Sequence, residues 1–318
     1  MERDKCVLIT GLGLVGYNLA KKFSDEGYQV YVLEKSPRRT IEYPNVKVFY
    51  GSILDFETFL ELSSYVDGII HTAAIPAEEY ARQKPLETFL VNVVGTLNAL
   101  EVTRRKKLRR MIFCSTGAVY GYRPDLKPLS EDDPVSIISF YALTKYIGEL
   151  LVEKYNELLF PPETKAITVR LSHVYGPGMF KREEVTYTAE DLWGAIEGKK
   201  VIIEAGDYPL NLTYVKDVCN AIFLIYTTEQ LKHTVYNISS GKLYKLAEAA
   251  EIIKKKIPTA QIEIRRGTET KFATQAPIRG PLSIDRISSE LGFKPEWDLE
   301  KGIEDYIREV RQMKNKQV

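Results

Sequence analysis

The stretch CVLITGLGLVG, residues 6–16, decides the fold of this chain. Its first four residues form an apolar run that predicts a buried strand, and an amphipathic pattern begins at residue 14 and predicts a helix. A Gly-x-Gly-x-x-Gly motif stands between the two. On its own this motif is weak, but between a strand and a helix it is typical of a turn that binds a dinucleotide pyrophosphate.

Each residue of this loop has a separate role in the expected site. Gly11 permits the tight turn, Gly13 lets the backbone approach the pyrophosphate, and Gly16 allows the helix to pack on the strand. The first helical residues, Leu14 and Val15, would turn their backbone amides toward the anion. The loop therefore predicts a dinucleotide-binding α/β unit.

Outward from this unit, short apolar runs alternate with amphipathic stretches as far as about residue 170. The runs are 6–9, 30–33, 46–49, 68–71, 111–114 and 166–169. The helical candidates lie near 14–26, 55–64, 85–107 and 139–159. This alternation predicts a doubly wound, Rossmann-type parallel sheet with helices on both faces.

Beyond residue 178 the alternation weakens, and helices are expected near 186–197, 217–228, 243–256 and 299–313. We therefore expect an NAD-binding domain over 1–175, together with 211–240. Residues 176–210 and 241–318 would form a smaller, interleaved substrate lobe. No linker-like tract separates the two parts, so a ligand is expected in a cleft between them.

A carboxylate at the end of the second strand bears on the choice of cofactor. Glu34 lies where an acidic side chain accepts hydrogen bonds from the adenosine ribose, which favours NAD over NADP. Lys35, Arg38 and Arg39 follow directly, and any of them could neutralise a 2′-phosphate if the loop turned inward. NADP therefore stays open as an alternative.

The chain contains five Tyr-x-x-x-Lys pairs, a spacing that puts both side chains on one face of a helix. They are Tyr17/Lys21, Tyr31/Lys35, Tyr43/Lys47, Tyr80/Lys84 and Tyr141/Lys145. The first three are expected to be structural, and Tyr80/Lys84 falls in a possible active-site loop. Tyr141/Lys145 is favoured because Thr116, at the end of the fifth strand, supplies a hydroxyl at the expected cofactor crevice. A nearby cationic lysine stabilises phenolate, which would let Tyr141 act as an acid and base.

Composition excludes several classes of partner. The 318 residues carry 44 Lys+Arg and 43 Asp+Glu, a net charge of +1, so neither nucleic acid nor an anionic membrane surface is an expected partner. Cys6, Cys114 and Cys219 lie far apart in apolar runs, and no histidine has ligand partners at metal-binding spacing. No run reaches the roughly 18 apolar residues of a membrane span. We therefore expect a cytoplasmic enzyme without a metal.

Several motifs in order resemble the extended short-chain dehydrogenase/reductase group, and within it the NAD-dependent epimerase/dehydratase family of sugar-modifying enzymes. The resemblance covers nearly the whole chain and rests on residues 10–16, 71–74, 92–96, 115–121, 141–145, 170–178 and 214–218. It implies that Thr116, Tyr141 and Lys145 are catalytic. It also implies a homodimer formed through the helices near 85–107 and 139–159.

For the cofactor, the resemblance implies that Glu34 and the glycine loop hold NAD, that Ala73 and Ala74 line it by close backbone approach, and that Asn92 is a structural helper. Many members have aspartate before isoleucine to hold the adenine. This chain has Ser52-Ile53 there, which puts that one contact in doubt.

At the substrate site the chain departs from the family's patterns. Gly117 and Ala118 replace the Asp-Glu pair of dehydratases, which makes dehydration a poor fit. His173 stands where epimerases have asparagine, and Leu210 stands where they have an arginine that clamps the diphosphate. Arg279, Arg265 or Arg266 could supply that clamp from elsewhere, and His173 is either a ligand contact or a packed core histidine.

Three functions follow from these features. The favoured one is an NAD-dependent epimerase of a nucleotide sugar, acting through a transient ketone. The missing arginine favours instead an NAD-dependent dehydrogenase of a free sugar, sugar acid or hydroxy acid. A non-catalytic dinucleotide sensor is the third.

Overall fold

A computed structural model describes residues 5–76, 78–178, 192–268 and 277–315. Its centre is a seven-stranded sheet in the order β11-β6-β5-β4-β1-β2-β3, and every neighbouring pair is parallel. The strands are β1 Cys6–Thr10, β2 Gln29–Glu34, β3 Val46–Tyr50, β4 Gly68–His71, β5 Arg110–Thr116, β6 Lys165–Leu171 and β11 Val235–Ile238. The predicted Rossmann-type α/β fold is confirmed.

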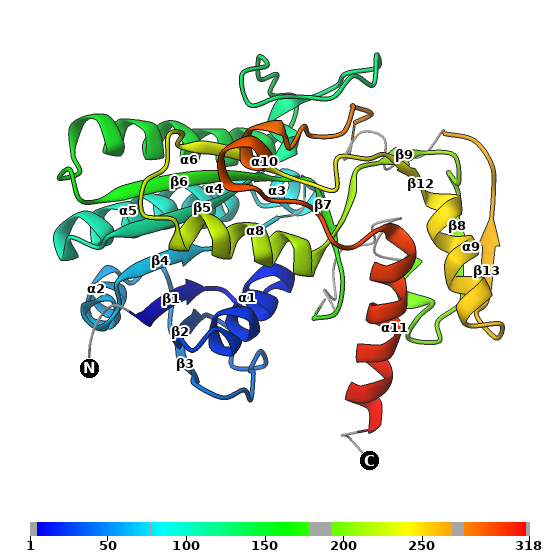
Figure 1. Ribbon diagram of the computed structural model, residues 1–318, viewed down its shortest axis with the longest axis horizontal. Coiled ribbons are helices and arrows are strands. Elements are labelled where there is room, and N and C mark those ends of the chain that lie inside the picture. Colours follow the sequence, from blue (N-terminus) through cyan, green and yellow to red (C-terminus); the bar gives the residue numbers. More distant parts are fainter. Residues whose placement is uncertain (1–4, 77, 179–191, 269–276, 316–318) are drawn as a thin grey trace.

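Helices cover both faces of the sheet (Figure 1), which explains why its central strands are continuous apolar runs. One face packs on α1 and α8, and the other on α2, α5 and α6. Their bounds are α1 Leu14–Asp25, α8 Val215–Thr227, α2 Phe56–Leu62, α5 Gly95–Lys106 and α6 Phe140–Leu158. The carboxyl ends of β1, β4, β5 and β6 therefore open toward one edge, where ligands bind in this class of sheet.

Beyond the main sheet, the chain forms short paired strands beside α9 and α11, to the right in Figure 1. The pairs are β7 His173–Tyr175 with β10 Leu212–Tyr214, β8 Val201–Ile203 with β13 Ile262–Ile264, and β9 Pro209–Leu210 with β12 Tyr244–Lys245. The helices of this part are α9 Leu246–Lys256 and α11 Leu299–Asn315, and α10 Asp285–Leu291 packs near β11. Half of the helix expected near 186–197 lies outside the described residues.

The helix expected over 85–107 is present, and it contains a π-helical turn that the sequence did not predict. The segment consists of α4 Pro85–Phe89, a π-helical turn at Leu90–Val94, and then α5. Asn92 lies in this turn. Its side-chain oxygen accepts a hydrogen bond from the Ile75 amide (2.8 Å), and its side-chain nitrogen donates to the Ile75 carbonyl (3.0 Å) and to the Thr144 hydroxyl (3.0 Å). A wider turn at a site of tertiary contacts is a frequent use of the π-bulge.

The three cysteines are buried and unpaired with one another, as expected of core thiols. Across the described ranges, no helix combines the length and apolarity that a membrane span requires.

Candidate active site

The glycine loop between β1 and α1 is closely packed at two of its three glycines. Gly11 has φ +83°, and a Cβ there would lie 3.0 Å from the Ala73 Cα. A Cβ on Gly16 would lie 2.0 Å from the Gly11 carbonyl oxygen, because the helix packs directly on the loop. Both positions need glycine for the fold itself.

Gly13 differs, since a Cβ there would meet nothing within 4 Å. It is the N-cap of α1, with an extended backbone (φ −74°, ψ −173°), and no side chain caps the helix. The first turn of α1 also lacks an acidic residue. The space above Gly13, beside uncapped amides at a helix N-terminus, therefore fits the pyrophosphate of a dinucleotide.

We expect Gly13→Ala to weaken NAD binding about 10- to 100-fold, because its methyl group would occupy that space. The fold should tolerate the change, since alanine adopts the Gly13 backbone angles and the methyl contacts no protein atom. Calorimetric titration with NAD and thermal melting measure the two effects. Gly16→Ala is the matched comparison, expected to unfold the domain; equal NAD affinity in Gly13→Ala and the wild type would disprove the assignment.

Glu34 lies at the end of β2, buried beside the glycine loop. One carboxylate oxygen accepts a hydrogen bond from the Leu12 amide (2.6 Å), and the other accepts one from the Ser36 amide (2.8 Å). Each oxygen keeps a further lone pair for a ribose hydroxyl. These contacts fix the carboxylate at the end of β2, beside the glycine loop, whereas Lys35 and Arg38 are exposed.

The other expected cofactor residues lie in the segments that follow β3 and β4. Ala73 lies against Gly11, and its amide donates to the Thr10 hydroxyl (3.3 Å). The Ser52 hydroxyl accepts a hydrogen bond from the Leu54 amide (3.1 Å). The Ile53 side chain packs closely against Gly95, so that a side chain on Gly95 would collide with it. Ala74 is half-buried in the segment that follows β4, whose backbone Asn92 braces.

The predicted catalytic residues come from β5 and α6. Thr116 ends β5, and its Oγ1 accepts a hydrogen bond from the Ala118 amide (3.1 Å). Its hydroxyl proton has no acceptor in the part of the chain that the structure describes, so it can be donated to a substrate oxygen. Tyr141 and Lys145 lie on the first turns of α6, which packs on β5 and β6.

Lys145 is deeply buried, with 3% of its surface exposed. Its Nζ lies 4.4 Å from the centroid of the Phe113 ring, a cation–π contact that ties the lysine to β5. Desolvation lowers the pKa of Lys145 to about 8, opposed by the nearby Cys114 and Glu149. The ammonium is thus held near the end of β5 at a cost to stability.

We therefore expect Lys145→Met to raise the free energy of unfolding by about 2–3 kcal/mol at pH 7 in the absence of ligand, while activity is lost. Because the folded pKa is below the unfolded value, Lys145 makes wild-type stability rise with pH between about 8 and 10.5, and the variant should lack this rise. Urea denaturation at pH 7 and 9.5 tests both points. Lys154→Met, on the exposed face of the same helix, should change stability little; a destabilised Lys145→Met protein would contradict the account.

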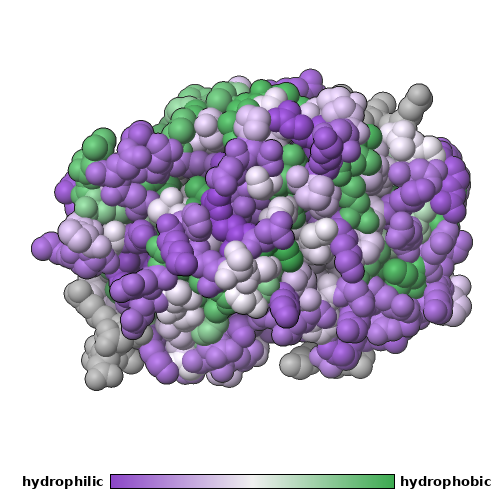
Figure 2. Space-filling view, turned by 45° about the horizontal axis from the view of Figure 1, so that its top comes forward, coloured by the Kyte–Doolittle hydropathy of each residue, from purple (hydrophilic) through white to green (hydrophobic). Residues whose placement is uncertain are grey.

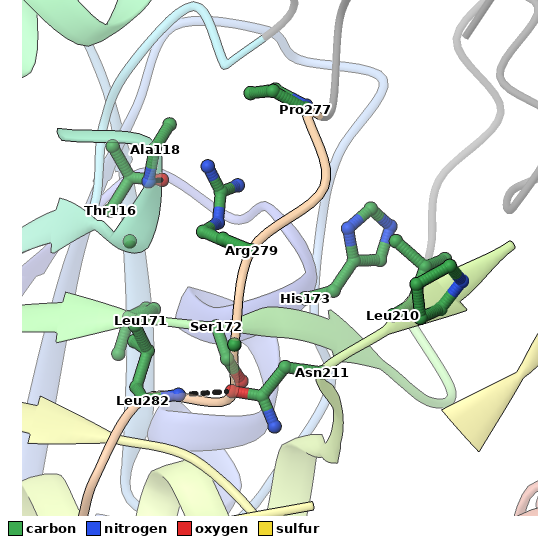
Figure 3. A pocket seen from close by; sticks show the side chains of 13 residues that line it. Thr116, Ala118, Leu171, Ser172, His173, Leu210, Asn211, Pro277, Arg279 and Leu282 are labelled. Carbon is green, nitrogen blue, oxygen red and sulfur yellow. Dashed lines mark hydrogen bonds between the residues drawn. The ribbon is translucent and has the colours of Figure 1, made fainter. Parts of the chain in front are cut away.

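A pocket opens beside Thr116 at the carboxyl ends of β5 and β6 (Figure 3). Thr116, His173, Leu210 and Arg279 all line it, together with Gly117, Ala118, Leu171, Ser172, Pro209, Asn211, Pro277, Gly280 and Leu282. Burial, and then the charge of Arg279, lowers the pKa of His173 to about 4, so His173 is neutral at pH 7.

Of the three arginines considered as a clamp, only Arg279 lines this pocket. Arg265 is exposed and pairs with Glu263 (2.9 Å). Arg266 is also exposed and pairs with Glu251 (3.0 Å).

The sequence did not reveal the residues that support the catalytic ones. Glu78 accepts hydrogen bonds from the amides of Phe140 (3.2 Å) and Tyr141 (2.9 Å), and so fixes the start of α6 from α3 Glu78–Gln83. Behind Thr116, the Arg170 guanidinium donates to the Glu149 carboxylate, with 2.7 Å between Nη2 and Oε2. No motif signals either arrangement, because the partners are distant in sequence and acquire their roles only in the fold.

An uncapped glycine loop, a buried acid at the end of β2, and a Tyr-x-x-x-Lys helix beside Thr116 define a Rossmann-type dinucleotide-dependent enzyme. The model of the NAD dependent epimerase/dehydratase family matches residues 7–239. The chain therefore belongs to this family, which confirms the resemblance, and NAD is its cofactor.

Known relatives match over nearly the full length. A putative UDP-glucose 4-epimerase of Methanocaldococcus jannaschii is 28% identical over 97% of this chain and 98% of its own. The structure resembles the UDP-glucose 4-epimerase of Thermotoga maritima, solved with UDP-glucose, with a TM-score of 0.85 at 23% identity over 97% and 99% of the two chains. It also resembles an epimerase from Methanothermobacter thermautotrophicus, with a TM-score of 0.85 at 25% identity over 98% and 93%.

Proposed function

We propose that this protein is an NAD-dependent epimerase of a nucleotide sugar. The observation that carries the proposal is the contact of Lys145 with Phe113 of β5, the strand that ends in Thr116. Lys145 lies on the first turns of α6, the helix that also carries Tyr141. Thr116 also lines a pocket, and the chain belongs to a family of NAD-dependent sugar-modifying enzymes. The two 4-epimerases similar to this chain support the choice of reaction and of a UDP-sugar as the first substrate to test.

In the proposed mechanism, Thr116 orients a sugar hydroxyl and Tyr141 accepts its proton, while the Lys145 ammonium stabilises the phenolate that forms. The glycine loop and Glu34 would hold NAD, which would supply the acceptor for the hydride that leaves the same carbon and the source of the hydride that later reduces the ketone. Tyr141 then gives the proton back. Inversion requires the sugar ketone to turn its other face before reduction, so the pocket must hold the ring loosely enough to rotate.

A net dehydrogenase of a free sugar, sugar acid or hydroxy acid is the second candidate. Leu210 favours it, because this buried leucine lines the pocket and cannot form the charge-assisted bonds with which an arginine binds a diphosphate. Dehydration is disfavoured, since Gly117 and Ala118 offer no acid or base beside Thr116.

We also propose that the protein is a cytoplasmic homodimer joined through α5 and α6. Exposed Leu90 and Leu97 lie seven residues apart in the π-helical turn and α5. Exposed Leu143 and Leu150 lie seven residues apart in α6. Figure 2, in which the top of Figure 1 is turned forward, shows hydrophobic side chains gathered along the upper edge of the molecule. Exposed leucines at this spacing on two helices that pack together favour association with another helix pair. Light scattering after gel filtration tests this; a monomer at micromolar concentration would refute it.

The reaction is tested by incubating the protein and NAD with UDP-, GDP- and dTDP-sugars, and with free sugars and uronates. Chromatography of the sugars and absorbance at 340 nm are followed together. An epimerase gives a second sugar nucleotide without net NADH. A free sugar or acid that yields NADH in proportion to product would establish the dehydrogenase instead.

A further inference from the structure

The Arg279 side chain is the unusual feature of the substrate pocket, because it is a desolvated cation that has no acidic partner among the described residues. Within the same residues its one hydrogen bond runs from Nη1 to the Gly121 carbonyl, at 3.3 Å. Burial lowers the pKa of the guanidinium to about 10, and the nearby Tyr208 opposes this shift. The group is therefore charged at pH 7, and no carboxylate within the described ranges lies at ion-pairing distance from it.

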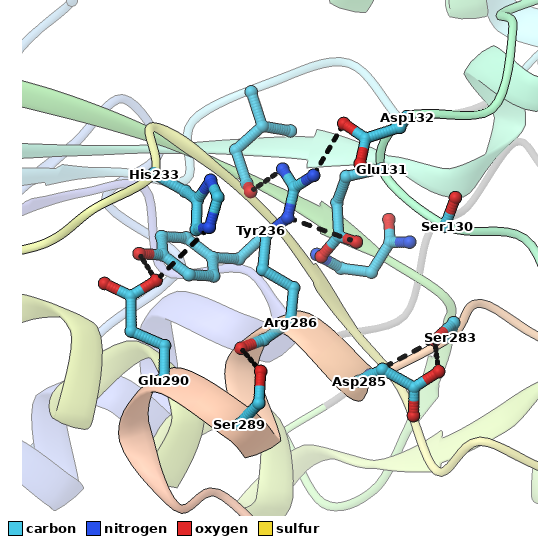
Figure 4. Close-up of polar contacts among 12 residues, drawn as sticks. Ser130, Glu131, Asp132, His233, Tyr236, Ser283, Asp285, Arg286, Ser289 and Glu290 are labelled. Atoms are coloured by element: carbon cyan, nitrogen blue, oxygen red, sulfur yellow. Dashed lines mark hydrogen bonds and ion pairs between the residues drawn. The ribbon is translucent and has the colours of Figure 1, made fainter.

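The other buried arginines compared with it either pair with a carboxylate or have almost no surface in contact with solvent. Arg170 pairs with Glu149, and Arg286 lies between Glu131 and Asp132 while donating to a backbone carbonyl (Figure 4). Arg110 also has no carboxylate partner among the described residues, but it is 2% exposed and donates to two backbone carbonyls just after α8. Arg279 instead keeps accessible surface and lines the pocket, so its unused donors face the space a ligand would fill.

The backbone holds Arg279 in place before any ligand binds. The amide of Arg123 donates to the Ile278 carbonyl (2.8 Å), and the amide of Leu129 donates to the Pro281 carbonyl (2.9 Å). A Cβ on Gly280 would lie 1.8 Å from the Lys127 carbonyl oxygen, so the segment is pressed against this loop. A cation fixed in this way costs little entropy when it binds an anion.

The position of the guanidinium indicates which anion it meets. The short 3-10 helix Gly117–Tyr120 joins Thr116 to Gly121, and the Gly121 amide donates to the Ala118 carbonyl (3.1 Å). Figure 3 shows Arg279 pointing toward Ala118, with His173 and Leu210 on the opposite side of the view. The cation thus lies at the end of the pocket where Thr116 binds the reacting hydroxyl, so it faces a substituent of the sugar ring.

We infer that the sugar bound in this pocket carries a carboxylate, as a uronic acid does, and that the Arg279 guanidinium binds it. The inference rests on the proposed function for the placement of the sugar at Thr116. It gives Arg279 a role in specificity for the sugar, in place of the diphosphate clamp that the sequence left open.

Two substrates that differ only at the sixth carbon test this. We would measure by calorimetry the affinity of the enzyme–NAD complex for UDP-glucuronate, UDP-glucose and UDP. The wild type should bind UDP-glucuronate at least about 10-fold more tightly than UDP-glucose. In Arg279→Gln that advantage should disappear, while the affinities for UDP-glucose and UDP change less than about twofold. Arg279→Lys should retain part of it, and Arg266→Gln, an exposed arginine, should retain all of it.

Equal losses for all three ligands in Arg279→Gln would overturn the inference and make Arg279 a diphosphate clamp. A wild type without preference for the carboxylate would overturn it as well. If no UDP compound binds, the nucleotide-sugar proposal fails, and the same comparison is made with free glucuronate and glucose. If the wild type then bound glucuronate more tightly than glucose and Arg279→Gln did not, the carboxylate site would stand without the nucleotide-sugar proposal. Equal affinity of the wild type for glucuronate and glucose would refute the carboxylate site.

Discussion

Replacing Tyr141 by phenylalanine is expected to lower kcat about 10³-fold while NAD binds as in the wild type. The change removes one oxygen, the proposed acceptor and donor of the substrate proton, and a positioned acid–base group contributes about 10²–10⁴-fold to rate. The backbone of α6 should be undisturbed, because Glu78 and Ser139 cap its first turn through backbone amides. Steady-state turnover of the substrate found in the panel, with NAD titration beside it, measures both quantities.

The matched control is Tyr80→Phe, which alters the other Tyr-x-x-x-Lys pair left open by the sequence. Tyr80 donates to Glu87 (2.8 Å), and we expect its loss to change kcat less than about threefold. If Tyr80→Phe abolished turnover and Tyr141→Phe did not, the catalytic assignment would be wrong. A protein that keeps its biological function in Tyr141→Phe would be a dinucleotide sensor.

Replacing Arg170 by methionine is expected to destabilise the fold by about 3–5 kcal/mol, since it leaves the Glu149 carboxylate buried without its counter-charge. Both side chains are almost fully buried, and Glu149 also accepts a hydrogen bond from the Ser115 hydroxyl. Arg170 in turn donates to the Tyr120 hydroxyl (2.9 Å). Urea denaturation of the ligand-free protein measures the loss.

Two further variants show whether charge burial causes that loss. Adding Glu149→Leu to Arg170→Met should restore much of the stability, because no unpaired charge remains. Arg104→Met breaks a more exposed pair with Glu101 and should cost less than about 1 kcal/mol. An Arg170→Met protein as stable as Arg104→Met would show that the pair contributes little.

Local sequence patterns were sufficient to predict six of the strands of the main sheet. Buried parallel strands are continuous apolar runs, so all six predicted strands are found in the main sheet. The helix predicted over 139–159 begins and ends within a residue of α6, because Ser139 supplies an N-cap that can be read from the sequence.

Features that depend on distant contacts could not be predicted. The π-helical turn around Asn92 follows from bonds to Ile75 and Thr144, which lie 17 and 52 residues away. Glu78 caps a helix 62 residues further along the chain. Arg279 was only one of three possible clamps until the fold placed it in the pocket and the other two in exposed ion pairs.

The most direct test of the proposed reaction follows the hydrogen on the inverted carbon. The protein would be incubated with NAD and a sugar nucleotide that carries deuterium on that carbon, with the product examined by mass spectrometry and absorbance read at 340 nm. An epimerase that returns the same hydride gives an epimer that keeps the deuterium, without a lasting rise in absorbance. A rise at 340 nm equal to the amount of oxidised sugar, with no epimer, would contradict the account and identify a net dehydrogenase.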